Sequence, residues 1–124
     1  MPKPQIVEMD YSVTLQQQGK ANAGPIVFVN KFNVKPEHVE HFLEVWKAAT
    51  RSERKQPGFI SAQFHRGIAG SNVFLNYAIW ESAEHHSAAL AQPDFQKALE
   101  MYPPDTVESP HIFQKLAISE VCVA

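Results

Sequence analysis

Three side chains in this sequence have the chemistry to activate a small aromatic molecule: Asn30, Trp80 and His86. The Asn30 amide stands in an apolar stretch and can donate a hydrogen bond to a developing enolate or phenolate oxygen. The Trp80 indole can stack on an aromatic ring while its N–H donates. The His86 imidazole titrates near neutral pH, which suits a base. These three residues form the candidate catalytic set.

Each candidate also has a structural interpretation, which the sequence leaves open. Asn30 fits a hydrogen-bonded amide in the core, because buried amides must be paired. Trp80 fits a core aromatic residue as well as a pocket wall. His85 and His86 are adjacent on one expected helix, so they cannot both face inward, and one of them is expected to be solvated.

Further residues are candidates for binding the same substrate. Asn76 is disfavoured in an apolar strand, so it either pairs across a dimer interface or faces a ligand. His65 and Arg66 are the last two residues of an expected strand, so their side chains point to opposite faces of the sheet. Either one of them binds an anionic group, or both are solvated. Tyr102 precedes two prolines and either caps a pocket or anchors the loop. The candidate substrate-binding set is Phe28, Phe32, Asn76, His65, Arg66 and Tyr102.

Composition and charge exclude several classes of function. With a net charge of −2, the chain lacks the excess of positive charge that is typical of proteins that bind nucleic acid or an anionic membrane. No apolar run approaches the roughly 20 residues of a membrane span, and no signal peptide is recognisable, so a cytoplasmic protein is expected. The single Cys122 excludes a cysteine-cluster metal site, and His38 and His41 lack an evident third ligand. We expect neither a metal nor another cofactor.

The hydrophobic pattern locates the elements that must position these side chains. Alternation predicts four strands, at residues 25–34, 59–66, 72–82 and 111–119. The last of them is expected to continue through Val121 and Val123. Apolar residues at helical spacing predict one helix from Pro36 to the Pro57-Gly58 stop. Ser82 is expected to cap a second helix that is broken at Pro93, and residues 102–110 are expected to form a proline-rich loop.

The element order is therefore β-α-β-β-α-β, an α+β ferredoxin-like fold with both helices on one face of a four-stranded antiparallel sheet. We place this domain at residues 25–124, after an extension and linker at 1–24 whose weak alternation suits an added edge strand. Phe74, Asn76, Ala78 and Trp80 share one strand face, so Asn76 and Trp80 should lie together, by the pocket or at a dimer seam. Because the strand is apolar on both faces, a homodimer through the sheet faces is expected; edge pairing or a ligand are the alternatives.

Framework motifs across residues 25–120 resemble the antibiotic biosynthesis monooxygenase (ABM) family. The motifs are Pro25-Ile-Val-Phe-Val-Asn30, Pro36-Glu-His-Val-Glu-His-Phe42, Pro57-Gly-Phe-Ile60, Trp80-Glu-Ser82 and Pro93-Asp-Phe95. The resemblance implies a dimeric α+β barrel with a pocket between sheet and helices. Some members are oxygenases of aromatic polyketides without metal, flavin or haem; others degrade haem, isomerise metabolites or have no known activity, and the fold does not choose among them.

The haem-degrading branch uses an asparagine, a tryptophan and a histidine; Asn30 matches, but Ala89 and Leu99 fall at the other two positions, so this activity is not expected. Among the activities that the resemblance implies, we expect a cofactor-independent monooxygenase that acts on an aromatic or polyphenolic, quinol-type small molecule. Such an enzyme needs a deprotonated substrate, O2 and a site that stabilises the anion. The alternatives are a small-metabolite isomerase and a non-catalytic ligand-binding or regulatory dimer.

Overall fold

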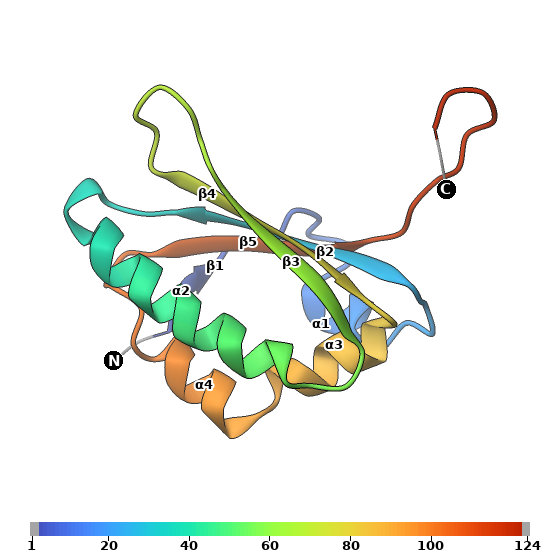
Figure 1. The fold of residues 1–124 in the computed structure, drawn as a ribbon, viewed down its shortest axis with the longest axis horizontal. Coiled ribbons are helices and arrows are strands. Elements are labelled where there is room, and N and C mark those ends of the chain that lie inside the picture. The colour runs from blue at the N-terminus through green and yellow to red at the C-terminus, as the bar shows by residue number, and fades with distance from the viewer. Residues whose placement is uncertain (1–2, 123–124) are drawn as a thin grey trace.

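The computed structural model describes residues 3–122, which form a single sheet with helices packed on one side (Figure 1). Along the chain, the elements are β1 (Gln5–Ile6), α1 (Leu15–Gln18), β2 (Ile26–Asn33), the 3-10 turn η1 (Pro36–His38), α2 (Val39–Arg54), β3 (Phe59–Arg66), β4 (Val73–Trp80), α3 (Ala83–Leu90), α4 (Pro93–Leu99) and β5 (Val107–Phe113). The sequence prediction of a ferredoxin-like β-α-β-β-α-β order is confirmed for β2 to β5.

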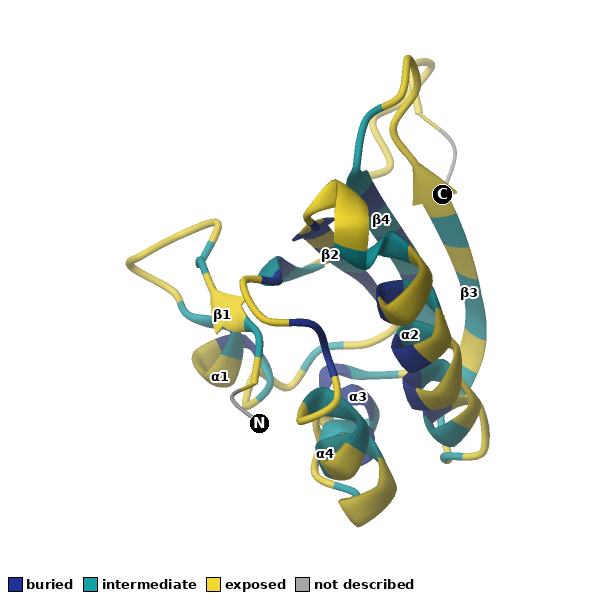
Figure 2. Ribbon diagram, turned by 90° about the vertical axis from the view of Figure 1, so that its left-hand side faces the viewer, coloured by how far each residue is buried: buried dark blue, intermediate teal, exposed yellow. Residues whose placement is uncertain are grey.

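The sheet has five strands in the order β1-β5-β2-β4-β3. The predicted four-stranded antiparallel sheet is confirmed in β5-β2-β4-β3, and β1, from the N-terminal extension, adds a fifth strand at its edge and makes the sheet mixed. Neighbours from β5 to β3 are antiparallel, whereas the two-residue strand β1 runs parallel to β5. Helix α2 lies on one side of the interior and β1 with α1 on the other, with α3 and α4 below them (Figure 2).

Strand β4 turns alternate residues to the helices and away from them. Phe74, Asn76, Ala78 and Trp80 are buried beneath the helices, and the intervening residues are only half-buried. Asn76 and Trp80 share the inner face, as predicted, but they do not lie together at the pocket, because only Asn76 lines the cavity. Across the ladder, Asn30 of β2 lies directly opposite Asn76.

The predicted course of the last strand is wrong at both ends. Residues 107–110 belong to β5 and not to a loop, and the strand ends at Phe113, well before Ser119 and Val121; Val123 lies outside the described residues. A proline is tolerated at position 110 of the strand because β1 pairs with β5 only as far as Glu108. Beyond Glu108, β5 is the edge of the sheet, and no neighbouring strand needs a backbone N–H from the side that faces away from β2. The next outward N–H, that of Ile112, is taken by the Gln18 side chain at 2.7 Å.

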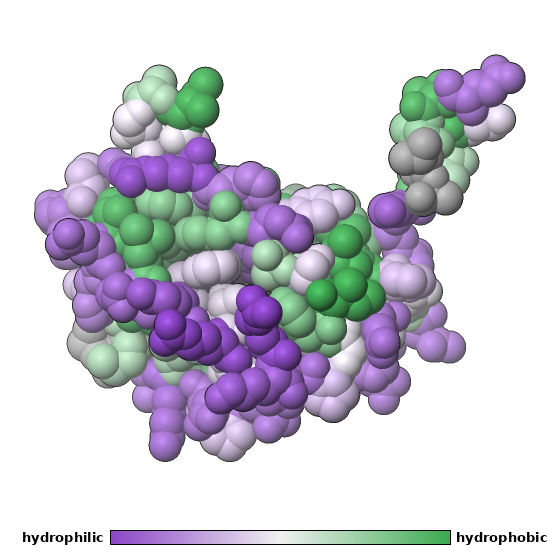
Figure 3. All heavy atoms as spheres, in the orientation of Figure 1, coloured by the Kyte–Doolittle hydropathy of each residue, from purple (hydrophilic) through white to green (hydrophobic). Residues whose placement is uncertain are grey.

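After β5, the chain leaves the body as a tail (Figure 1). Its apolar side chains are exposed, as Figure 3 shows at the end of the molecule that carries the tail; they are Leu116, Ile118 and Val121. This segment does not pair with any strand of the described chain. None of the described helices has the length and apolar character of a membrane span.

Two apolar clusters hold the helices on the sheet. One gathers Ile26, Phe28, Ala78, Trp80, Ala83 and Ala89, and the other gathers Phe32, Val34, Phe42, Val45, Phe74 and Tyr102. Along β2 and β4, the opposed pair Asn30 and Asn76 lies between these clusters. The polar pair therefore interrupts an otherwise continuous apolar layer at its centre.

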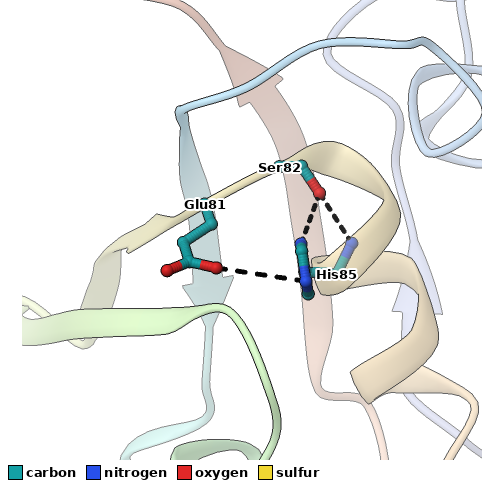
Figure 4. A network of polar contacts seen from close by, with 3 residues as sticks. All are labelled: Glu81, Ser82 and His85. Carbon is teal, nitrogen blue, oxygen red and sulfur yellow. Dashed lines mark hydrogen bonds and ion pairs between the residues drawn. The ribbon is translucent and has the colours of Figure 1, made fainter.

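The start of α3 is fixed by a local network (Figure 4). Ser82 caps the helix, as predicted: its Oγ accepts the His85 N–H at 3.0 Å and lies 2.7 Å from His85 Nδ1. On its other side, His85 Nε2 is 4.0 Å from the Glu81 carboxylate. Gly58 has a positive φ of 87°, and a Cβ built there would overlap the His85 ring.

We predict that Gly58→Ala lowers the free energy of unfolding more than Gly70→Ala. Both glycines have positive φ, which costs an alanine about 1–2 kcal/mol. Only Gly58 faces a neighbour, however, and overpacking adds about 1–3 kcal/mol. Chemical denaturation of both variants, and of Gly58→Ala combined with His85→Gly, should show that removing the His85 side chain, whose Cβ and ring both lie against the added methyl group, recovers the extra loss relative to His85→Gly alone. Equal losses at the two glycines would contradict this close approach.

Candidate functional site

A cavity of about 130 Å³ lies between the inner face of the sheet and the helices. Its apolar walls come from six elements and include Ile6, Leu15, Phe28, Phe32, Trp46, Leu90, Phe95 and Leu99. Its polar lining consists of Asn30, Glu53, Asn76, Gln96, Tyr102 and Glu108. An aromatic enclosure with a few convergent polar groups is the usual form of a small-molecule site.

The two asparagines are the central polar groups of this cavity. They are 7% and 5% exposed, and neither Oδ1 atom has a hydrogen-bond partner among residues 3–122. Leaving a buried polar atom unpaired costs about 1–3 kcal/mol, so native proteins rarely do so without a reason. The opposed amides can therefore bind a polar ligand placed above the sheet.

Two carboxyl groups reach the same cavity from different elements, Glu53 from α2 and Glu108 from β5. Burial raises the pKa of Glu53 to about 8, and the nearby Glu108 carboxylate adds to this shift. Burial also raises the pKa of Glu108 to about 7, and the Asn30 amide, which donates a hydrogen bond to it, partly offsets the rise. One carboxyl beside one carboxylate can both donate and accept a proton near neutral pH.

Tyr102 closes the cavity beside these acids. Its ring stacks on Phe32 with centroids 6.0 Å apart, and it is only 3% exposed. Burial raises the pKa of the Tyr102 phenol well above its usual value, and the charges of Glu108 and Glu53 raise it further. The phenol therefore stays protonated and can act as a hydrogen-bond donor.

The structure brings together five of the residues singled out from the sequence. Phe28, Asn30, Phe32, Asn76 and Tyr102 all line the cavity. Their roles in binding or chemistry stay predictions, but their positions are those that a shared substrate would need.

Trp80 and His86 lie behind the cavity wall and do not line it. His86 packs on Phe28 with ring centroids 4.1 Å apart, and on Trp80 at 5.4 Å. Of the adjacent histidines, His86 faces inward and His85 faces the Ser82 and Glu81 side chains (Figure 4). Burial lowers the pKa of His86 to about 4, so the ring is neutral at ordinary pH. Their catalytic roles stay untested predictions.

The end of β3 lies outside the cavity. His65 is exposed, and its Nδ1 lies 3.3 Å from the Leu75 carbonyl oxygen. Arg66 sits over the Phe74 ring at 5.0 Å and donates to Ser71 and Asn72 in the hairpin. Neither side chain lines the cavity with the other candidates.

Sequence reasoning did not identify the two glutamates as candidates. Glu53 lies between Arg51 and Arg54 at the charged end of α2, a position typical of a solvated residue. It nevertheless continues the buried stripe of Phe42, Val45 and Ala49 at i+4, and that spacing is the available signal. Glu108 was hidden among prolines that indicated a loop. Within residues 3–122, no three histidine, cysteine or acidic side chains gather in an arrangement that could hold a metal ion.

Known proteins share this architecture. The Synechocystis protein "Uncharacterized protein sll1783" is 27% identical over 92 residues, which cover 74% of this chain but only 63% of that protein. The structure of SnoaB, a cofactor-independent oxygenase from Streptomyces nogalater, matches with a TM-score of 0.67 and 26% identity, over 79% of this chain and 99% of SnoaB.

A protein from Shewanella loihica PV-4 matches with a TM-score of 0.64 and 26% identity, over 77% of this chain and 97% of its own. The sequence model of the antibiotic biosynthesis monooxygenase family covers residues 25–101, from β2 through α4. With more than half of its length matched and the fold in agreement, the chain belongs to the antibiotic biosynthesis monooxygenase family.

Proposed function

We propose that this protein is a cofactor-independent monooxygenase that acts on a small aromatic, quinol-type molecule inside the cavity. The observation that carries the proposal is the opposed pair Asn30 and Asn76, whose Oδ1 atoms have no hydrogen-bond partner in the described residues and lie at the centre of an aromatic enclosure. Membership of the family and the similarity to SnoaB, itself a cofactor-independent oxygenase, support the same conclusion.

The chemistry requires the substrate to supply the electrons. A carbon acid such as an anthrone loses a proton, its carbanion reacts with O2, and the resulting hydroperoxide loses water to leave a carbonyl group. The protein must orient the ring, exclude water and stabilise the anion. Phe28, Phe32 and Trp46 hold the ring. The unpaired Oδ1 atoms of Asn30 and Asn76 accept hydrogen bonds from substrate hydroxyl groups, and the amide N–H groups of the same side chains are the donors for the developing oxyanion.

Trp80 and His86 support this site from behind in the proposal. Their rings pack against each other, and His86 packs against Phe28, which is itself a wall of the cavity. A small-metabolite isomerase with a cationic or histidine-lined pocket is less well supported, because no lysine, arginine or histidine lines this cavity in the described part of the chain.

We also propose a homodimer through the outer face of the sheet. On β2 and β4, this face carries Val27, Val29, Leu75, Tyr77 and Ile79, and the register places Val29 beside Tyr77 and Val27 beside Ile79. The four residues other than Val27 are half-buried in a single chain. An apolar surface of this kind is typical of an interface between copies.

Asn30→Ala should lower oxygen consumption with anthrone at least tenfold, because loss of one oxyanion donor typically costs 10²–10³-fold in rate. The measurement uses an oxygen electrode and protein freed of metals and flavin. Asn33→Ala is the matched control, since this asparagine ends the same strand but is exposed and outside the cavity. Activity that survives in Asn30→Ala at the level of the control would contradict the role of the amide.

Light scattering should give twice the 13.9 kDa mass of one chain. Tyr77→Lys should shift the protein toward the monomer, because it places a charge within the proposed interface. Ile68→Lys is the control, as this residue is 89% exposed at the β3–β4 turn. A monomeric native protein would refute the proposed dimer while leaving the cavity chemistry to be tested separately.

A further inference from the structure

Two glutamates line the cavity and have no role in the proposed function: Glu53, which is buried, and Glu108, which is half-buried. We infer that Glu53 and Glu108 share one proton across the cavity, that Glu108 takes the proton of the substrate, and that the substrate enters uncharged. This inference rests on the proposed oxygenase function for its chemical step. The sharing of the proton is a property of the resting protein and can be tested without any substrate.

The geometry isolates the two carboxyls from positive charge. Glu53 projects from α2 and Glu108 from β5 into one enclosure. Tyr102, in the segment between α4 and β5, is the remaining titratable group that lines it. The other elements contribute only uncharged side chains: Ile6 from β1, Leu15 from α1, Asn30 from β2, Asn76 from β4, Leu90 from α3 and Gln96 from α4. No ion pair of residues 3–122 includes either glutamate.

Two like charges in such an enclosure disfavour each other, so one carboxyl retains its proton. Asn30 distinguishes the two groups. Its amide donates toward Glu108 and favours the charged form there, whereas Glu53 has burial and the charge of Glu108 acting against ionisation. Glu108 is therefore the carboxylate and Glu53 the acid. The second N–H of the Asn30 amide remains free for a substrate oxygen.

This resting state satisfies the proton balance of the reaction. The Glu108 carboxylate removes a proton from the substrate carbon, and the electron pair left on that carbon reduces O2 as the C–O bond forms. The peroxide takes a proton from the pair. Removal of the second C–H proton then breaks the O–O bond, and the departing hydroxide leaves as water. Two protons leave carbon and two reach oxygen, so the pair returns to its starting state.

The same charge defines the substrate class. A cavity that already holds one carboxylate and lacks a lining cation repels an anionic ligand. A neutral phenol or anthrone avoids this repulsion and becomes an anion only as its proton moves to Glu108. Substrates with a permanent carboxylate on the ring that enters the cavity are therefore expected to be excluded.

Carbon-13 NMR of protein labelled at the glutamate carboxyl carbons tests the shared proton directly. In the wild type, two carboxyls should titrate near pH 7 and 8, apart from the others. In Glu108→Gln, the remaining Glu53 signal should titrate at lower pH, because the neighbouring charge is gone. Exposed Glu100→Gln should change neither signal. Ordinary titration of all glutamates, or no shift of Glu53 in Glu108→Gln, would overturn the inference.

Oxygen consumption tests the catalytic step. We expect Glu108→Gln to lower kcat for anthrone at least tenfold, and Glu53→Gln to change the pH profile while retaining more activity. The wild type should prefer anthrone over a ring-carboxylated anthrone at least tenfold in kcat/KM. Unchanged kcat and pH profile in Glu108→Gln, or loss of activity only in His86→Gln, would overturn the inference about the base. If the wild type consumes no oxygen with these substrates, the proposed oxygenase function and the catalytic step are both refuted. The NMR titration still tests, independently, whether Glu53 and Glu108 share a proton.

The pair also makes stability depend on pH. Both folded-state pKa values lie above the ordinary value of a glutamate, so the folded protein binds more protons than the unfolded chain between about pH 4.5 and 8. Stability should therefore fall as the pH rises through this window. We expect urea denaturation to show this fall in the wild type and a flatter profile in Glu53→Gln. Glu100→Gln is the control. If the free energy of unfolding of Glu53→Gln depended on pH as steeply as that of the wild type, the raised pKa of Glu53 would be contradicted.

Discussion

The burial of unpaired polar groups between the sheet and the helices is the constraint on which the rest of this structure depends. Asn30 and Asn76 interrupt the apolar layer, and Glu53 and Glu108 add two carboxyls to the same space. Each unsatisfied buried group costs about 1–3 kcal/mol, and a buried charge costs more. The apolar clusters on both sides of the asparagines supply the stability that keeps these groups enclosed. These polar groups therefore lower the stability of the fold, which indicates that their role is to bind a ligand.

Rigid elements hold each group in place. The asparagines face each other because antiparallel pairing fixes the register of β2 and β4, and Glu53 points inward because it continues the buried stripe of a helix. The pairing of β5 with β2 places Pro110 opposite Asn30 and Glu108 opposite Phe32, so Glu108 is the diagonal neighbour of Asn30. Positions on helices and strands are more precise than positions on loops, and an oxyanion site depends on such precision. The cavity is thus a preorganised polar centre with aromatic walls.

Much of the arrangement could be predicted from periodicity. The spacing of apolar residues identified α2, and the alternation of β4 placed Asn76 and Trp80 on one face. The prediction failed at β5, because Pro110 indicates a loop unless the neighbouring strand is known to stop short of it. It also missed Glu53, since a charged residue beside arginines at a helix end is usually solvated. Both errors concern residues whose environment is made by distant parts of the chain.

The sequence by itself determined the order of the elements from β2 to β5, the residues that share a face of β4 and the resemblance to the family, because these follow from local patterns of apolar residues, turns and caps. Only the tertiary structure decided which polar side chains meet. The packing of α3 on the sheet decided that His86 lies behind Phe28 and not in the cavity. The packing of α2 and β5 decided that Glu53 lines the same cavity as Glu108 and does not face water. Burial and charge proximity set these pKa values, and both are properties of the folded chain.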